Sequence, residues 1–193
     1  MKRTPNLALQ RRWNAALKSE RLVEAFATVP REAFLGRGPW RLLSGTQAGL
    51  GYTRTNDADP RHLSHNVLVA IDPGRWLNNG HPSFLAWLIE QLELKDGQSV
   101  CHVGAGTGYY SAILARMVGE AGRVIAIEVD KVLARRARRT LRTIDRWKLW
   151  PGTAFRTTRV RSMRFSSTPA STTFRAFGST RCGQGAGSSC PLR

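Results

Sequence analysis

Hydrophobic residues in the middle of the chain form two short uninterrupted runs with a helical stripe between them. The first run, Val100–Val103, carries no charged side chain, as expected of a strand covered on both faces. The second run, Val124–Ile127, has the same character. The stripe between them has the spacing of a helix that packs on a sheet: Tyr110, Ile113, Leu114, Met117 and Val118. The order strand, helix, strand predicts a βαβ unit of an α/β fold.

Small and acidic residues follow the two predicted strands. Gly104, Gly106 and Gly108 come directly after the first strand, where glycine permits a sharp turn and lets a ligand touch the backbone. Glu128 comes directly after the second strand. Ligands of open α/β sheets bind at the carboxyl ends of the strands, so these residues predict a ligand site.

The spacing of the glycines favours one class of ligand. A dinucleotide fingerprint requires G-x-G-x-x-G, whereas this loop is G-x-G-x-G and Tyr109 occupies the place of the third glycine. The compact loop suits S-adenosylmethionine, whose amino-acid part would meet the loop backbone. Glu128 would accept hydrogen bonds from both ribose hydroxyls. A ligand-free βαβ unit and a nicotinamide or flavin site are the alternatives.

The remaining pattern predicts helices on either side of this unit. Residues 6–28 are expected to form one or two amphipathic helices, residues 36–66 loops, and Val67–Ile71 a short buried strand. Two further stripes have helical spacing, the first made of Phe84, Leu85, Leu88, Ile89 and Leu92 and the second of Leu133, Ala134, Ala137, Leu141 and Ile144.

Three segments resemble a known family of enzymes. Val-Pro-Arg-Glu-Ala-Phe at 29–34, Leu92–Gly97 and Val103–Gly119 are similar to protein-L-isoaspartate O-methyltransferases, and the resemblance covers about residues 15–145. It implies a Rossmann-like class I methyltransferase sheet with an N-terminal helical cap. The expected divisions are a cap with loops over 1–66, a partial S-adenosylmethionine-binding core over 67–146, and a tail over 147–193.

The resemblance also implies site residues. The family has a Thr-Ile-Ser segment before a proline, which contacts the cofactor and whose serine is regarded as catalytic. Alignment on Pro82 places Asn78, Asn79 and Gly80 at those positions, so the serine position has no side chain. Ser83 lies on the other side of the proline, and the Asn-Asn-Gly sequence equally suits a tight turn. The expected cofactor-binding residues are Asn79, Gly80, Gly104, Ala105, Gly106, Thr107, Gly108, Glu128 and Val129, and no catalytic residue is assigned.

The resemblance implies methyl transfer from S-adenosylmethionine to a protein carboxylate, such as an isoaspartyl side chain. A carboxylate is already ionised at neutral pH, with a pKa of about 4, so no strong general base is required. A methyltransferase fold with a different acceptor, or with no activity, is the alternative. The expected partner is a protein or peptide that bears a carboxylate, and the chain is expected to act as a monomer.

The length and composition of the chain are those expected of one domain followed by a tail. The chain has 193 residues, of which 41% are hydrophobic, and it lacks a bilayer-spanning segment and a signal-peptide pattern, so a cytoplasmic location is expected. Cys101, Cys182 and Cys190 have no metal-ligand spacing. His62 and His65 lie three residues apart without supporting ligands, so no metal site is expected.

The net charge of +17 raises a second class of function. All 13 acidic residues lie before residue 146, whereas residues 146–193 hold 9 of the 30 basic residues. A basic chain can bind nucleic acid through phosphates. The predicted helix after Asp130 also carries five arginines, which form either a phosphate-binding face or a solvated outer face: Arg135, Arg136, Arg138, Arg139 and Arg142.

The tail over 147–193 lacks any strand or helix period and is rich in Ser, Thr and Arg. We expect it to be disordered or translated out of frame, with the C-terminal half of the sheet missing or irregular. With G/C-rich codons read two bases along, Arg161–Pro169 can become Phe-Asp-Ala-Ile-Phe-Val-Asn-Ala, which resembles the family's fourth strand. The same shift can yield Leu-Arg-Pro-Gly-Gly and Leu-Val-Leu-Pro-Leu further on. A basic tail that evolved for binding is the alternative.

Overall fold

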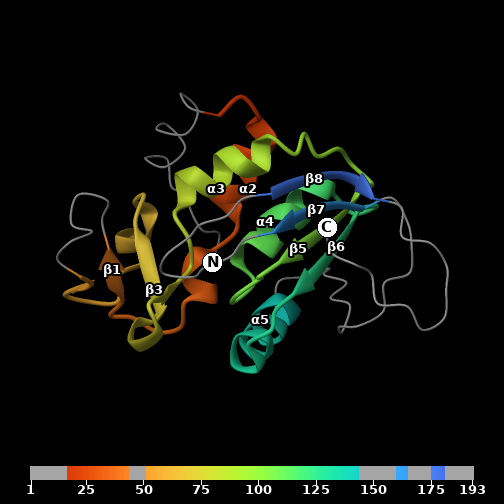
Figure 1. Cartoon of the computed structure of the whole chain (residues 1–193). Helices are drawn as coiled ribbons and strands as arrows, with labels where there is room; N and C mark the ends of the chain where they lie inside the picture. Colours follow the sequence, from red (N-terminus) through yellow and green to blue (C-terminus); the bar gives the residue numbers. More distant parts are fainter. Residues whose placement is uncertain (1–16, 44–50, 144–159, 165–174, 181–193) are drawn as a thin grey trace.

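Two four-stranded sheets organise the molecule, seen here in a computed structural model that describes residues 17–43, 51–143, 160–164 and 175–180 (Figure 1). The sheet nearer the carboxyl terminus has the order β6-β5-β7-β8, and the other sheet has the order β2-β1-β3-β4. Within these residues, no helix has the length and hydropathy needed to cross a bilayer.

The larger sheet forms around β5 (Ser99–Val103), which pairs in parallel with β6 (Arg123–Ile127) on one side and β7 (Val160–Arg164) on the other. The strand β8 (Arg175–Thr180) runs antiparallel to β7. Because the chain leaves β5 toward β6 and returns on the opposite side to β7, the carboxyl end of β5 is the switch point at which such sheets bind ligands.

Three helices bury the main hydrophobic core against this sheet: α2 (Glu20–Thr28), α3 (Pro82–Glu90) and α4 (Tyr109–Val118). Every member of the predicted stripe on α4 is buried, which confirms its orientation. Phe26 of α2 packs edge-on against Tyr109 and Tyr110 at the start of α4. Gly119 ends α4 at a φ of 67°, as its position in the sequence predicts.

The helix α5 (Lys131–Thr143) follows β6 and packs beside the glycine loop (Figure 1). Asp130 caps its first turn, because one carboxylate oxygen accepts from the backbone N–H groups of Val132 and Leu133 at 2.8 and 3.1 Å. Leu133, Ala137 and Leu141 are buried. A Cβ built on Gly108 would lie 3.1 Å from Leu141, so α5 packs closely on that glycine.

The smaller sheet is antiparallel and precedes the core in sequence. Its strands are β1 (Arg41–Leu43), β2 (Thr53–Arg54), β3 (Leu68–Asp72) and β4 (Leu77–Asn78). Three 3₁₀ helices accompany it: η1 (Arg31–Phe34), η3 (Pro60–Ser64) and η4 (Pro73–Arg75).

The structure differs from the sequence expectations in two places. Residues 36–66 include β1 and β2, because strands of three and two residues are too short to show an alternating pattern. The pairing of β1 with β3 crosses the division expected between residues 66 and 67. The segment 147–193, expected to hold no strand, contributes β7 and β8 to the sheet. The expected helix positions Leu9, Trp13 and Ile144 and the cysteines Cys182 and Cys190 lie outside the described residues.

Candidate functional site

The glycine loop turns sharply at the carboxyl end of β5. Gly104, Gly106 and Gly108 have φ values of 79°, 57° and 94°, in the left-handed region that other residues rarely adopt. The backbone N–H groups of Gly104 and Ala105 both donate to the carbonyl oxygen of Ile127, at 2.8 and 3.0 Å. The loop is therefore tied to the end of β6, as the predicted βαβ unit requires.

The acid after β6 lies against this loop. The N–H of Gly106 donates to Oε2 of Glu128 at 2.6 Å, and the N–H of Asp130 donates to Oε1 at 2.9 Å. Each carboxylate oxygen retains capacity for another hydrogen bond. The structure thus brings Glu128 and the glycine loop together, and the carboxylate keeps lone pairs for a diol.

The backbone beside Glu128 is open at Gly106. Among the residues that the structure describes, a Cβ built on Gly106 would meet no atom within 4 Å, so a ligand could approach this backbone closely. The next residue after the acid, Val129, is 92% exposed, an apolar side chain with no cover. Thr107 is buried in the same loop. An exposed apolar side chain beside a carboxylate suits a nucleoside, with the base on the valine and the sugar on the acid.

The Asn-Asn-Gly segment forms the tight turn that its sequence permits. Oδ1 of Asn78 accepts from the N–H of Gly80 at 2.9 Å, and Gly80 has a φ of 81°. The hydroxyl of Tyr110, in the first turn of α4, donates to the carbonyl oxygen of Gly80 at 3.4 Å. The segment therefore lies next to the helix that begins at the glycine loop.

The position of the family serine has no space for a side chain in this conformation. A Cβ built on Gly80 would lie 2.5 Å from Cδ1 of Leu85 and 3.4 Å from the ring of Tyr110. Ser83 does not replace it, because its side chain is exposed on the first turn of α3 and lies 3.2 Å from Nδ1 of His81.

Arg31 is a residue of this region that the sequence analysis missed. It opens η1, is only 6% exposed, and donates through Nη2 to Oδ1 of Asn79 at 2.5 Å and to the carbonyl oxygen of Val67 at 2.8 Å. Its Nη1 donates to the carbonyl oxygen of Leu63 at 3.2 Å. The sequence contains only one sign of this residue, the arginine inside the Val-Pro-Arg-Glu-Ala-Phe motif. The hydrogen-bond partners of that arginine are more than thirty residues away.

The titratable side chains near Gly80 are held neutral. Burial, with a smaller contribution from the Arg31 charge, lowers the pKa of His81. Burial raises the pKa of Tyr109 to about 12 and raises that of Tyr110 as well. On the sheet behind the loop, burial lowers the pKa of His102 to about 4, and its Nδ1 lies 2.8 Å from Oγ of Ser111.

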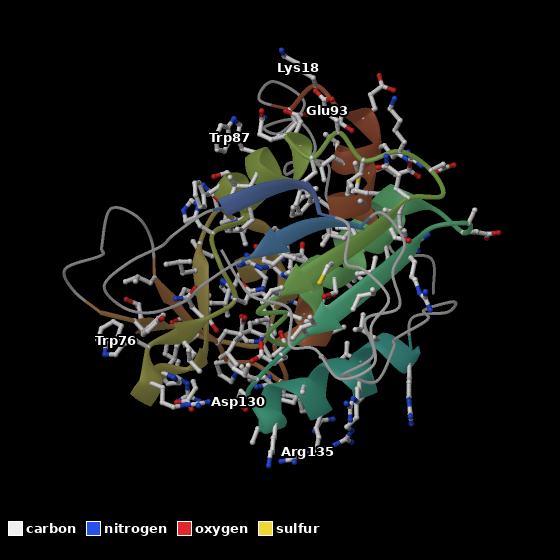
Figure 2. All side chains as sticks on the ribbon, turned by 45° about the vertical axis from the view of Figure 1, so that its right-hand side comes forward. Lys18, Trp76, Trp87, Glu93, Asp130 and Arg135 are labelled. Atoms are coloured by element: carbon white, nitrogen blue, oxygen red, sulfur yellow. The ribbon has the colours of Figure 1, made fainter. Side chains whose placement is uncertain are left out.

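The other candidate residues lie away from this site. Nε2 of His62 lies 2.8 Å from Oδ1 of Asp57 in an exposed pair, and His65 is exposed. Among the residues whose placement is described, no three His, Cys, Asp or Glu side chains form a group that could hold a metal ion. Four of the five arginines of α5 are exposed, and Figure 2 shows Arg135 pointing away from the molecule, whereas Arg136 is half-buried near Gly36.

Comparison with protein families gives one match over most of the chain. The model of the family described as Protein-L-isoaspartate(D-aspartate) O-methyltransferase (PCMT) matches residues 2–151. The protein-L-isoaspartate O-methyltransferase 2 of Archaeoglobus fulgidus is 43% identical over 93 residues, which are 44% of this chain and 42% of the relative. The enzyme of Ignicoccus hospitalis is 31% identical over 129 residues, 66% of this chain and 50% of the relative.

A third relative, the protein-L-isoaspartate O-methyltransferase of Thermotoga maritima, is 30% identical over 124 residues, 64% of this chain and 33% of the relative. The chain therefore spans between a third and a half of the length of these relatives. The shared sequence includes the loop and strands that build the candidate site.

Solved structures give the same fold. One, of a protein-L-isoaspartate O-methyltransferase, superposes with a TM-score of 0.58 at 23% identity and covers 75% of this chain and 41% of its own. Another, a putative enzyme of that name from Plasmodium falciparum in complex with S-adenosyl-L-homocysteine, has a TM-score of 0.52 at 16% identity, over 77% of this chain and 63% of its own. The predicted Rossmann-like methyltransferase fold is confirmed.

Proposed function

Because this chain belongs to the protein-L-isoaspartate(D-aspartate) O-methyltransferase family, we propose that it binds S-adenosylmethionine and methylates a protein carboxylate of the isoaspartyl kind. The observation that carries the proposal is the contact between the Gly106 N–H and Glu128 Oε2, which joins the glycine loop and the ribose acid in one site. A relative from Plasmodium falciparum is described in complex with S-adenosyl-L-homocysteine.

The residues present fit this cofactor. The open backbone at Gly106 would admit its amino-acid end, Glu128 would accept from the ribose hydroxyls, and the exposed Val129 would lie under the adenine. The sulfonium of the bound cofactor supplies an electrophilic methyl group. The assignment of Asn79, Gly80, Gly104, Ala105, Thr107 and Gly108 to the same site is part of the proposal.

The chain's own residues would orient the reactants and exclude water. An acceptor carboxylate is ionised at neutral pH, so it needs no side chain to remove a proton. Burial keeps the phenols of Tyr109 and Tyr110 protonated, so neither is a base beside the turn, and this agrees with such chemistry. Alignment of the two reactants is then the main contribution of the protein.

Because residue 80 is glycine, this chain lacks the serine hydroxyl that is regarded as catalytic in the family. Without a hydroxyl at this position, the chain must place the acceptor by backbone groups of the Asn78–Gly80 turn and by Tyr110. A methyltransferase fold that takes another acceptor, or none, is the rival. Incubation with S-adenosylmethionine and matched isoaspartyl and aspartyl peptides tests this: methylation of the isoaspartyl peptide alone supports the proposal, and methylation of neither contradicts it.

The outer face of α5 favours a second candidate function, nucleic-acid binding. Arg135, Arg138, Arg139 and Arg142 are exposed, and no ion pair links them to the residues that the structure describes. Retention on DNA or RNA that falls steeply with salt, and that is lost when these arginines are replaced by glutamine, would support it. Retention unchanged by those substitutions would exclude this face of α5 as the binding surface.

The family relationship alone supports three further proposals about the biological setting of this chain. Repair of isoaspartyl damage, a cytoplasmic location and a monomeric state are the expectations. Cell fractionation tests the location, and light scattering on the purified chain tests the oligomeric state.

A further inference from the structure

A chain of hydrogen bonds runs from the smaller sheet to the glycine loop through Arg75. Its Nε donates to Asp72 Oδ2 at 2.7 Å, within the β3–β4 connection, and its Nη1 donates to Asp130 Oδ2 at 2.7 Å. The N–H of Asp130 donates to Glu128, which in turn accepts from Gly106. Five residues from three separate turns are thus joined without a gap.

Arg75 and Asp130, which form the central ion pair of this chain of bonds, lie close in sequence to two different parts of the proposed site. Arg75 ends η4 and is followed within two residues by β4, the strand that leads into the Asn78–Gly80 turn. Asp130 starts α5 and lies two residues after the ribose acid. In Figure 2, Asp130 lies between the start of α5 and the turn that carries Trp76. Arg75 therefore joins the β3–β4 connection, from which the chain enters the Asn78–Gly80 turn, to the loop that carries Glu128.

Asp130 is held in place from two sides. Its Oδ1 caps α5, whereas its Oδ2 accepts from Arg75, so the two oxygens have separate tasks. The hydrogen bond from Arg75 is also the largest cause of the lowered pKa of Asp130, which keeps this carboxylate ionised. Charge-assisted hydrogen bonds of this kind are shorter and stronger than neutral ones.

We propose that Arg75 is a positioning residue, which couples the conformation of the Glu128 loop to that of the β3–β4 connection and so prepares the cofactor site. The proposal rests on the proposed function, because it concerns the same site. Arg75 touches neither reactant in this scheme, and it acts through Asp130 and Glu128. Its removal loosens the Glu128 loop without opening the hydrophobic core, since its side chain lies at the surface.

The chain contains a matched control for this residue. Arg61 also follows an Asp-Pro pair at the start of a 3₁₀ helix, and its Nε donates to Asp59 Oδ2 at 2.7 Å, the same distance as in the Arg75–Asp72 pair. The two arginines differ in the long-range bond, because only Arg75 reaches a partner 55 residues away among the bonds of the described chain. Arg61→Gln therefore removes a local pair alone.

The test measures cofactor binding and backbone exchange on the full chain. Calorimetry with S-adenosylmethionine should show about threefold to fivefold weaker binding for Arg75→Gln than for the wild type, the range that one exposed charge pair allows. Arg61→Gln should bind as the wild type does. Asp130→Asn keeps a good helix cap but loses the charge pair, so it should weaken binding to the same extent, and the double variant should be no weaker than either.

Hydrogen exchange at the Gly106 amide gives a readout without any ligand. Arg75→Gln should speed exchange at Gly106 and at Asp130, whereas Arg61→Gln should leave both rates unchanged. Equal effects of the two arginine variants on exchange and affinity would overturn the proposal. Wild-type protein that binds no S-adenosylmethionine would overturn the proposed function instead, and the exchange rates would still decide the coupling.

Discussion

The N–H of Gly106 donates to Oε2 of Glu128 at 2.6 Å, across 22 residues of sequence. This bond joins the turn after β5 with the acid after β6, at the switch point of the sheet. A backbone amide and a carboxylate from two different loops thus contact each other at the edge of the sheet where we propose the cofactor site.

Gly80→Ala will destabilise the fold more than an equivalent change elsewhere. Gly80 and Gly51 have φ values of 81° and 80°, but among the described residues a Cβ on Gly80 would meet Leu85 whereas one on Gly51 would meet nothing within 4 Å. Gly51→Ala should cost about 1–2 kcal/mol from the left-handed backbone alone. Gly80→Ala should cost about 1 kcal/mol more, because Cδ1 of Leu85 must move aside in the core. Urea denaturation measures both.

The Leu85 contact can be isolated by a double-mutant cycle. Leu85→Val removes the Cδ1 atom that a Cβ on Gly80 would strike, so it should reduce the penalty of Gly80→Ala. Equal penalties at Gly80 and Gly51 would contradict the account. The same clash implies that a serine placed at residue 80 alone will fail to restore the family's Thr-Ile-Ser arrangement.

Asn79→Leu will destabilise the chain by about 1–3 kcal/mol. It removes the 2.5 Å acceptor of Nη2 of the buried Arg31, so this group keeps its bond to the Val67 carbonyl but loses its shortest one, and a lost hydrogen bond to a buried charge is costly. Asn79→Asp keeps the acceptor oxygen and should retain the stability of the wild type. As a control, Asn66→Leu removes an exposed acceptor of the Ser83 N–H and should cost less than about 1 kcal/mol. Thermal unfolding that ranks Asn66→Leu as the worse variant would contradict this assignment.

Acid will destabilise the fold through His102. Burial lowers the pKa of this side chain from 6.5 to about 4, so between these values the unfolded chain binds a proton that the folded chain does not. The free energy of unfolding therefore falls as the pH drops through that window. The full contribution is on the order of 3 kcal/mol, since each pKa unit corresponds to about 1.4 kcal/mol. Urea denaturation between about pH 7.5 and about pH 4.5 measures it.

The comparison of variants separates His102 from the other titrating groups. His102→Gln should flatten the loss of stability in this window, whereas His62→Gln, at an exposed position, should not. NMR titration of the His102 ring in the wild type reports the same pKa even where the variant does not fold. A ring that titrates near 6.5 would contradict the buried, neutral state.

The coding DNA tests the origin of the segment 147–193, which we propose is read out of frame. The backbone of β7 lies between β5 and β8, a central place that favours apolar residues, yet Val160–Arg164 includes two arginines. We expect codons that give an apolar strand over Arg161–Pro169 when read two bases along. Codons that give no such strand contradict the proposal.

The hydrophobic pattern of the sequence predicted the helices and strands whose hydrophobic period runs without interruption. Val100–Val103, the α4 stripe and Val124–Ile127 are found within one residue of their expected bounds, because each carries a clear hydrophobic period. The expected burial of the second strand is wrong, since β6 lies at one edge of the sheet and all its residues are half-buried. Leu22, Val23 and Phe26 are buried on α2 as expected. The stripe on α3 held except at Phe84, which is 41% exposed and stacks on Trp87.

The hydrophobic pattern could not predict contacts between segments that are far apart in the sequence. The bonds of Arg31 to Asn79 and of Arg75 to Asp130 join residues 48 and 55 positions apart, and a single arginine in a sequence gives no indication of its partner. The short strands β1 and β2 are stabilised by pairing with β3 and with each other rather than by their own composition. The position of Glu128 was predictable, because strand ends in a βαβ unit are set by the pattern itself.

Calorimetric titration of the full chain with S-adenosylmethionine, comparing wild type with Glu128→Gln, tests the central claim most directly. The substituted amide keeps the size of the side chain but removes the charged acceptor that bonds Gly106 and that we propose for the ribose hydroxyls. Loss of a hydrogen bond to a charged group costs about 1.5–3 kcal/mol, so binding should weaken by about tenfold or more. Equal affinity of the two proteins, with both folded by circular dichroism, would contradict the account.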